Sequence, residues 1–137
     1  MTTVFTSMTN SEVISCFEND QLPGEFHHAD HIRLAFAFLS EYQPLDALRG
    51  FSEALRRYAA ARGQAQRYHE TITYSYFFLI RERIARTAPA SWNEFEARNP
   101  DLFQWKPGIL DRYYRESTLQ SELACAVFLF PDKLAEL

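Results

Sequence analysis

The chain has 137 residues, of which 47% are hydrophobic and 15% aromatic, and this length and composition suit one domain with a substantial apolar core. Fourteen basic and eighteen acidic residues give a net charge of -4, and the two signs are interspersed along the chain. Because phosphate binding needs a dense basic surface, these charges argue against nucleic acid as a partner.

The cysteines and the apolar segments indicate a cytoplasmic protein. Cys16 and Cys125 lie far apart and match no metal-binding or redox spacing, which favours a reducing compartment. Residues 1–7 lack the basic and then apolar pattern of a signal peptide, and the uncharged stretch of residues 71–80 is too short to span a bilayer. We therefore expect no membrane contact.

The hydrophobic periodicity predicts an all-α fold, a compact bundle of about five to six helices with a short C-terminal helix. The predicted domain covers residues 11–137, and the Thr/Ser-rich residues 1–10 are expected to form a flexible N-terminal arm. Asn10 or Ser11 can cap the first helix, which should end before the turn at residues 22–24.

Two longer amphipathic helices should follow this turn. The first is expected from Phe26 or Asp30 to Tyr42, and its inward face begins with His31. The second is expected from Pro44 to Gly63, because proline suits the first position of a helix and glycine suits its end.

A fourth helix is predicted over residues 68–86, and its uncharged section should be central in the bundle. The aromatic and β-branched content of residues 71–80 also permits a buried strand. Helix is favoured because residues 81–86 extend the segment past normal strand length, and Pro89 supplies an end.

Shorter helical segments should complete the chain. Residues 92–97 and 109–114 each fit a short helix between Pro/Gly turns, and Ser117 or Thr118 can cap a last helix that Pro131 ends. Leu123 and Val127 are expected on the inward face of that last helix.

All four histidines occur in two short segments, residues 26–31 and 68–71. In a helix, His27 and His31 are four positions apart and His28 and His31 three apart, so either pair can share a metal ion. We predict His27, His31 and His69 as ligands, with His28 as a substitute for His27. Imidazole ligands suit zinc or iron, with nickel or copper as alternatives.

The carboxylates of the same segments would complete this site. Glu70 is predicted to be the catalytic residue, either as a fourth ligand or as the base that takes a proton from bound water. Asp30 is predicted to orient a histidine ring behind the metal. The neighbouring pocket for a small organic substrate is expected to be lined by Tyr68, Thr73, Tyr76 and Phe38.

Each of these residues also has a structural alternative. His27 and His28 can be loop residues, Asp30 a helix N-cap, Glu70 a first-turn carboxylate favoured by the helix dipole, and His69 a hydrogen-bonded core residue.

Further along, Trp105 and Lys106 combine with Tyr113, Tyr114 and Arg115 in a second group of aromatic and basic residues. These residues would serve either an anion or partner contact, or a surface turn that packs its aromatic rings on the bundle.

The segments FHHADHIRLA at residues 26–35 and YHETIT at residues 68–73 resemble a group of small uncharacterised bacterial proteins. The similarity extends through residues 105–107 and 113–115. The resemblance implies that the two histidine segments form one unit, and it attaches no activity to them.

These observations predict a small metal-binding protein, a metal-dependent enzyme of hydrolytic or non-haem oxidative chemistry acting on a small organic substrate. Two alternatives remain open at this point. One is a small-molecule-binding or sensing module without catalysis. The other is a structural or interaction protein with no site, whose exposed aromatic residues form a homodimer surface.

Overall fold

Helices make up the regular structure of this chain, and the computed structural model describes residues 5–22 and 25–133. Within those ranges five helices have at least seven residues and no strand forms, which confirms the predicted all-α fold. The α-helices are α1 (Asn10–Glu18), α2 (His28–Glu41), α3 (Pro44–Ala61), α4 (Glu70–Thr87), α5 (Trp92–Arg98), α6 (Pro100–Phe103), α7 (Glu116–Leu119) and α8 (Glu122–Ala126). Two 3-10 turns, η1 (Ala65–Arg67) and η2 (Ile109–Arg112), lie between them.

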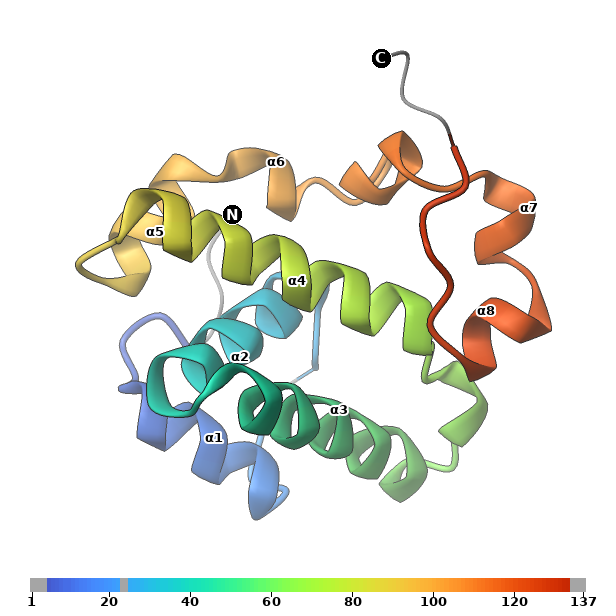
Figure 1. Ribbon diagram of the computed structural model, residues 1–137. Coiled ribbons are helices and arrows are strands. Elements are labelled where there is room, and N and C mark those ends of the chain that lie inside the picture. The colour runs from blue at the N-terminus through green and yellow to red at the C-terminus, as the bar shows by residue number, and fades with distance from the viewer. Residues whose placement is uncertain (1–4, 23–24, 134–137) are drawn as a thin grey trace.

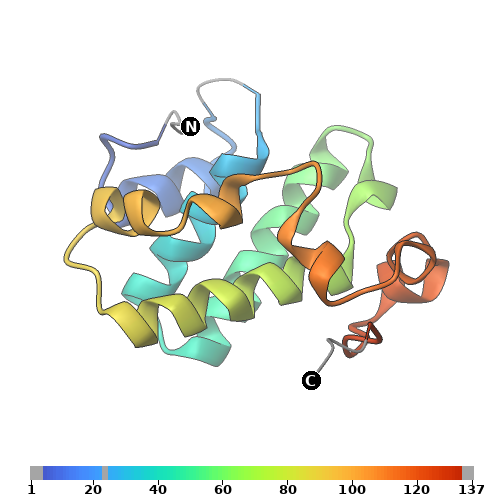
Figure 2. The same ribbon diagram turned by 90° about the horizontal axis from the view of Figure 1, so that it is seen from above.

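The three longest helices, α2, α3 and α4, pack against one another, and α1 lies against α2 (Figure 1). After α4 the chain turns back, and Figure 2 shows the segment from α5 through η2 running beside α4 toward α7 and α8. The short helix α8 then packs at the beginning of α4. The start of α4 is therefore enclosed by the C-terminal part of the chain.

Helix α1 begins one residue earlier than the predicted caps. Thr9 is the N-cap: its Oγ1 accepts the Glu12 N–H at 3.1 Å, and Glu12 Oε1 accepts the Thr9 N–H at 2.8 Å. This reciprocal capping box satisfies two donors, whereas Asn10, one of the predicted caps, is already the first helical residue.

The chain just before α1 belongs to the packed core. Phe5 is 1% exposed, and its ring centroid lies 5.8 Å from that of Phe17 on α1. The predicted flexible arm of residues 1–10 therefore does not extend as far as Phe5, because a buried aromatic ring anchors the chain there. Residues 1–4 of that arm lie outside the described residues.

Arg33 of α2 is a buried cation that the sequence analysis did not single out. It is 2% exposed, donates to Asn10 Oδ1 at 2.7 Å and to the Met8 carbonyl at 2.9 Å, and lies over the Trp92 ring at 5.2 Å. Burial lowers the pKa of Arg33 to about 10, so the guanidinium stays charged at neutral pH. It ties the start of α1 to α2.

Residues 71–80 are helical, as predicted, and directly follow Glu70 at the start of α4. Phe78 departs from the central position, because its side chain is 44% exposed. The helix ends at Ala88, whose φ of 43° is left-handed.

Neither α4 nor any other helix in the described ranges combines the length and the apolar character of a membrane span. Six residues of α4 are buried: Thr71, Thr73, Ser75, Tyr76, Phe77 and Ile80.

The predicted last helix is wrong in extent. Helix α7 ends at Leu119, α8 is a separate helix capped by Ser121, and residues 127–133 are not helical. Leu123 and Val127, expected to face inward, are 60% and 44% exposed. The predicted helix is interrupted at Ser121. Its hydroxyl accepts the Ala124 N–H and so caps the start of α8.

Gly50 provides a test of packing between α2 and α3. A Cβ at this position would lie 2.5 Å from Phe38 Cε1, and Phe38 is 3% exposed. Glycine to alanine inside a helix usually stabilises by about 1 kcal/mol, but overpacking a core costs about 1–3 kcal/mol. Gly50→Ala should therefore lower the free energy of unfolding by up to about 2 kcal/mol in urea titrations.

The matched control relieves the clash by shortening the side chain at position 38. In the Gly50→Ala background, Phe38→Leu should cost less than it does in the wild-type protein, because the smaller side chain relieves the contact. A Gly50→Ala protein more stable than wild type would contradict this account.

Candidate functional site

The two histidines at the start of α2 lie in different environments. His27 is the N-cap residue and is largely exposed, with its Nε2 3.8 Å from Glu25 Oε2. His28 is half-buried, and its Nε2 donates to the Leu102 carbonyl at 2.8 Å. Burial lowers the pKa of His28, and the hydrogen bond to Leu102 opposes this shift. His28 therefore joins α2 to α6.

His31 packs against an aromatic ring. The imidazole centroid lies 4.1 Å from that of Phe26. Burial, followed by the nearby charge of His28, lowers the pKa of His31 to about 3. The ring is therefore neutral in the folded protein at physiological pH.

His69 caps α4 and uses both of its ring nitrogens. Nδ1 accepts the Ile72 N–H at 3.1 Å, and Nε2 donates to the Leu119 carbonyl at 2.7 Å. The carbonyl can only accept, so the proton resides on Nε2 and the Nδ1 lone pair is occupied by Ile72. Because a metal ligand needs a free lone pair, this arrangement makes His69 a structural tie between α4 and α7.

The metal-binding prediction is therefore wrong. Within residues 5–22 and 25–133, no three His, Cys, Asp or Glu side chains are grouped so that they can hold one ion. His27 lies in solvent, His31 packs on Phe26, and His28 and His69 are engaged by carbonyls of the C-terminal half. The function built on these ligands, a metal-dependent enzyme using zinc or iron, has no site in the described chain.

Glu70 is paired and is not placed as the predicted catalytic base. Its Oε1 accepts from Arg56 Nη2 at 2.8 Å and from the Tyr68 hydroxyl at 2.9 Å, and the Arg56 guanidinium lies 4.5 Å over the Tyr68 ring. Burial and then the hydrogen bond to Glu70 raise the pKa of Tyr68 to about 12. This three-residue group links α3 to the beginning of α4.

Asp30, predicted to orient a histidine ring, acts on the backbone. The side chain is buried, and its Oδ2 accepts the His27 N–H at 2.8 Å, which is the reciprocal bond of a capping box. Negative charge in the first turn also favours the helix dipole.

The predicted substrate pocket does not form as one cavity. Phe38 is in the core beside α3, Thr73 is buried in α4, and Tyr68 belongs to the Glu70 group. Of these four predicted residues, Tyr76 lines a cleft, together with residues that the prediction did not include.

That cavity is a cleft of about 630 Å³ between α4 and the segment from residue 105 to α7, and we call it the Trp105 cleft. The turn of residues 105–108 contains a cis Lys106-Pro107 peptide, and Trp105 and Gly108 pair as an isolated bridge. Trp105 is 53% exposed, and the His28 ring lies 4.8 Å behind it. The other lining residues are Ile72, Tyr76, Lys106, Pro107, Leu110, Asp111, Tyr114, Glu116, Leu119 and Lys133.

The Tyr76 hydroxyl lies in the wall of the Trp105 cleft. A Cβ on Gly108 would be 3.3 Å from this hydroxyl, so the glycine allows the turn to approach it closely. The Tyr76 side chain is 7% exposed, and its hydroxyl has no hydrogen bond to any residue of the described ranges. Burial, with the charge of Asp111 as a smaller cause, raises the pKa of Tyr76 to about 12, so the hydroxyl remains a donor.

Charges of both signs surround the cleft. Lys133 Nζ donates to the Asp111 carbonyl at 2.9 Å, and Lys106 forms no ion pair within the described part of the chain. Asp111 and Glu116 bring carboxylates to the same rim. The sequence signal for this site was the aromatic and basic group around Trp105, which composition alone could not separate from a packed surface turn.

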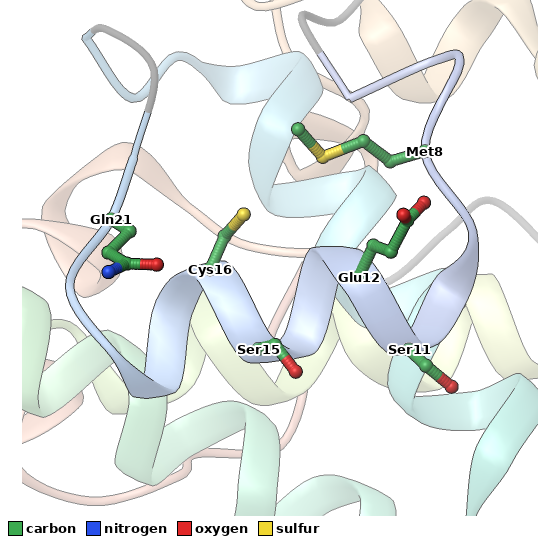
Figure 3. Close-up of a pocket in the computed structure, with 6 residues that line it drawn as sticks. All are labelled: Met8, Ser11, Glu12, Ser15, Cys16 and Gln21. Carbon is green, nitrogen blue, oxygen red and sulfur yellow. The ribbon is translucent and has the colours of Figure 1, made fainter.

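A shallower hollow of about 350 Å³ lies along α1 (Figure 3). The hydroxyls of Ser11 and Ser15 point away from the side on which Met8 and Cys16 lie in that view. Glu12 Oε1 is already used by the Thr9 N–H. The hollow therefore assembles no pair of groups suited to catalysis.

No family model, curated protein or solved structure matches this chain. The resemblance of the histidine segments to small bacterial proteins therefore stays a prediction.

The lowered pKa of His31, a partly buried side chain, predicts a pH dependence of stability. Its folded pKa of about 3 lies below the value near 6.5 expected for the unfolded chain, so between these values only the unfolded state binds the proton. The contribution is complete above about pH 6.5 and is lost as the pH falls toward 3. Urea titrations across this range should show it.

The comparison protein is His31→Gln, which cannot titrate there. The difference in unfolding free energy between the wild type and His31→Gln should change in favour of the variant as the pH falls. Because the charge of His28 contributes to the lowered pKa of His31, the difference between the two proteins reports the titration of His31 together with its coupling to His28. A difference that stays constant across the range would contradict the assignment.

Proposed function

We propose that this chain binds a small organic molecule in the Trp105 cleft. The observation that carries the proposal is the Tyr76 hydroxyl, which belongs to a buried side chain, has no partner within the described ranges and adjoins the cleft at Gly108. The Tyr76 hydroxyl is not among the enclosed polar atoms of the described chain, so it opens to the cleft, where it can donate to an acceptor on a bound ligand.

The shape and walls of the cleft support the same proposal. Its volume of about 630 Å³ falls in the range of small-molecule sites. Trp105 presents a half-exposed ring for stacking, and Ile72, Leu110 and Leu119 supply aliphatic surface. The proposed ligand is a planar organic molecule with a hydrogen-bond acceptor directed at Tyr76.

The proposal concerns binding and requires no catalytic step. The cytoplasm is the proposed compartment, and its support is that Cys16 and Cys125 are both free thiols.

The experiment is a thermal-shift screen of planar aromatic compounds that carry carbonyl or carboxylate acceptors, followed by calorimetric titration of those that raise Tm. Tyr76→Phe removes only the hydroxyl and should weaken binding about 5- to 10-fold, the value of one hydrogen bond. Trp105→Ala and Gly108→Ala should also weaken it, the first by removing the stacking ring and the second by crowding the hydroxyl.

The matched control is Tyr42→Phe, which deletes a hydroxyl from a half-exposed tyrosine outside the cleft. It should leave the Kd unchanged. The proposal fails if no compound raises Tm, or if the compounds that do so bind Tyr76→Phe and Gly108→Ala as tightly as the wild type.

A further inference from the structure

The segment after α8 is held along one edge by hydrogen bonds to α4 and Tyr114. Val127 is extended, with φ -138° and ψ 157°, and the following residues rise past the first turns of α4 (Figure 1). Thr71 Oγ1 donates to the Val127 carbonyl at 2.8 Å and accepts the Leu129 N–H at 3.1 Å. The Tyr114 hydroxyl donates to the Leu129 carbonyl at 2.7 Å. The polar groups of Leu129 therefore face the body of the protein.

The opposite edge is unpaired with respect to the part of the chain that the structure describes. In an extended chain, the N–H and C=O groups of successive residues point to opposite edges, so those of Phe128 and Phe130 point away from Thr71. Neither residue makes a backbone hydrogen bond within residues 5–22 and 25–133. Such an unpaired edge is a template for pairing with another extended chain.

Apolar side chains surround this edge. Phe130 is 83% exposed and Phe78 is 44% exposed, and the half-buried Phe128 ring lies 5.7 Å from the first and 6.3 Å from the second. Leu123 is 60% exposed on the neighbouring α8. Residues 127–130 carry no charge that would oppose pairing. We call residues 127–130 together with Phe78 and Leu123 the Phe130 edge.

We propose that the Phe130 edge pairs with the same edge of a second copy of this chain, forming a twofold antiparallel dimer. The edge is complementary to itself: with Leu129 opposite Leu129 of the second copy, each Phe128 faces a Phe130, and each such pair can exchange both of its N–H···O=C bonds. Leu129 occupies the non-hydrogen-bonded position of this register, as its inward-facing groups require.

The neighbouring residues limit the pairing to this short stretch. Pro131 has no N–H and cannot extend the ladder. Asp132 accepts from the Arg115 N–H at 3.0 Å and from the Thr118 hydroxyl, which holds the chain to α7 beyond the edge. A closed dimer is expected in place of an open fibre.

The test is analytical ultracentrifugation of the full chain over a range of concentrations. The wild type should reach twice the 16.0 kDa mass of one chain. Phe130→Glu places a charge at the edge, and Phe130→Pro removes its N–H; each should raise the dimer Kd by about tenfold or more. Circular dichroism checks that both variants fold, which the exposed position of Phe130 favours.

The matched control is Leu45→Glu, which places the same charge at a side chain that is 78% exposed at the start of α3. It should dimerise as the wild type does. A wild-type chain that is monomeric at every concentration, or a dimer that both Phe130 variants leave unchanged, would overturn the proposal.

The register has a separate readout. In a Cys16→Ser, Cys125→Ser background, Leu129→Cys should form a disulfide-linked dimer on oxidation, because the twofold axis brings this position against itself. Val127→Cys should not, since residue 127 would face residue 131. Equal cross-linking of the two variants would refute this register.

Discussion

The buried polar side chains of α4 must find hydrogen-bond partners, and this requirement shapes the C-terminal third of the molecule. Thr71 and Ser75 are buried in the first turns of the helix, and the partly buried N-cap His69 precedes them, so each would be costly to leave without a partner. Each is satisfied by the chain beyond residue 113, through Leu119, Val127 and Leu129, and Tyr114. These side chains at the start of α4 thus hold α7 and the segment after α8 in place.

The same bonds connect the Trp105 cleft with the Phe130 edge. Tyr114 lines the cleft, while its hydroxyl accepts from Ser75 and donates to Leu129. One edge of the terminal segment is therefore hydrogen-bonded to α4 and Tyr114, and the other edge has no hydrogen bond to any described residue. The proposed ligand site and the proposed dimer surface both depend on the hydrogen bonds of Tyr114. They use different residues, so each proposal can hold without the other.

The histidines show where sequence reasoning reached its limit. Their grouping in two segments was a real signal, because His28 and His69 both act at helix starts and both bind distant carbonyls. Their spacing, however, could not reveal that Leu102 and Leu119 would occupy those nitrogens. The alternatives of a capping Asp30 and a hydrogen-bonded His69 agree with the bonds that form. Ring geometry depends on partners 50 or more residues away, which no local pattern encodes.

The helical class, the long helices and the helical state of residues 71–80 followed from the sequence alone, because the 3.6-residue period of apolar side chains and the Pro/Gly breaks are local properties. Tertiary structure decided the rest. It placed Tyr76 against Gly108 to form one wall of a cleft, and it left residues 127–130 non-helical where a helix was expected. Both outcomes arise from contacts between remote segments, and the energy of such contacts is set only when the whole core has assembled.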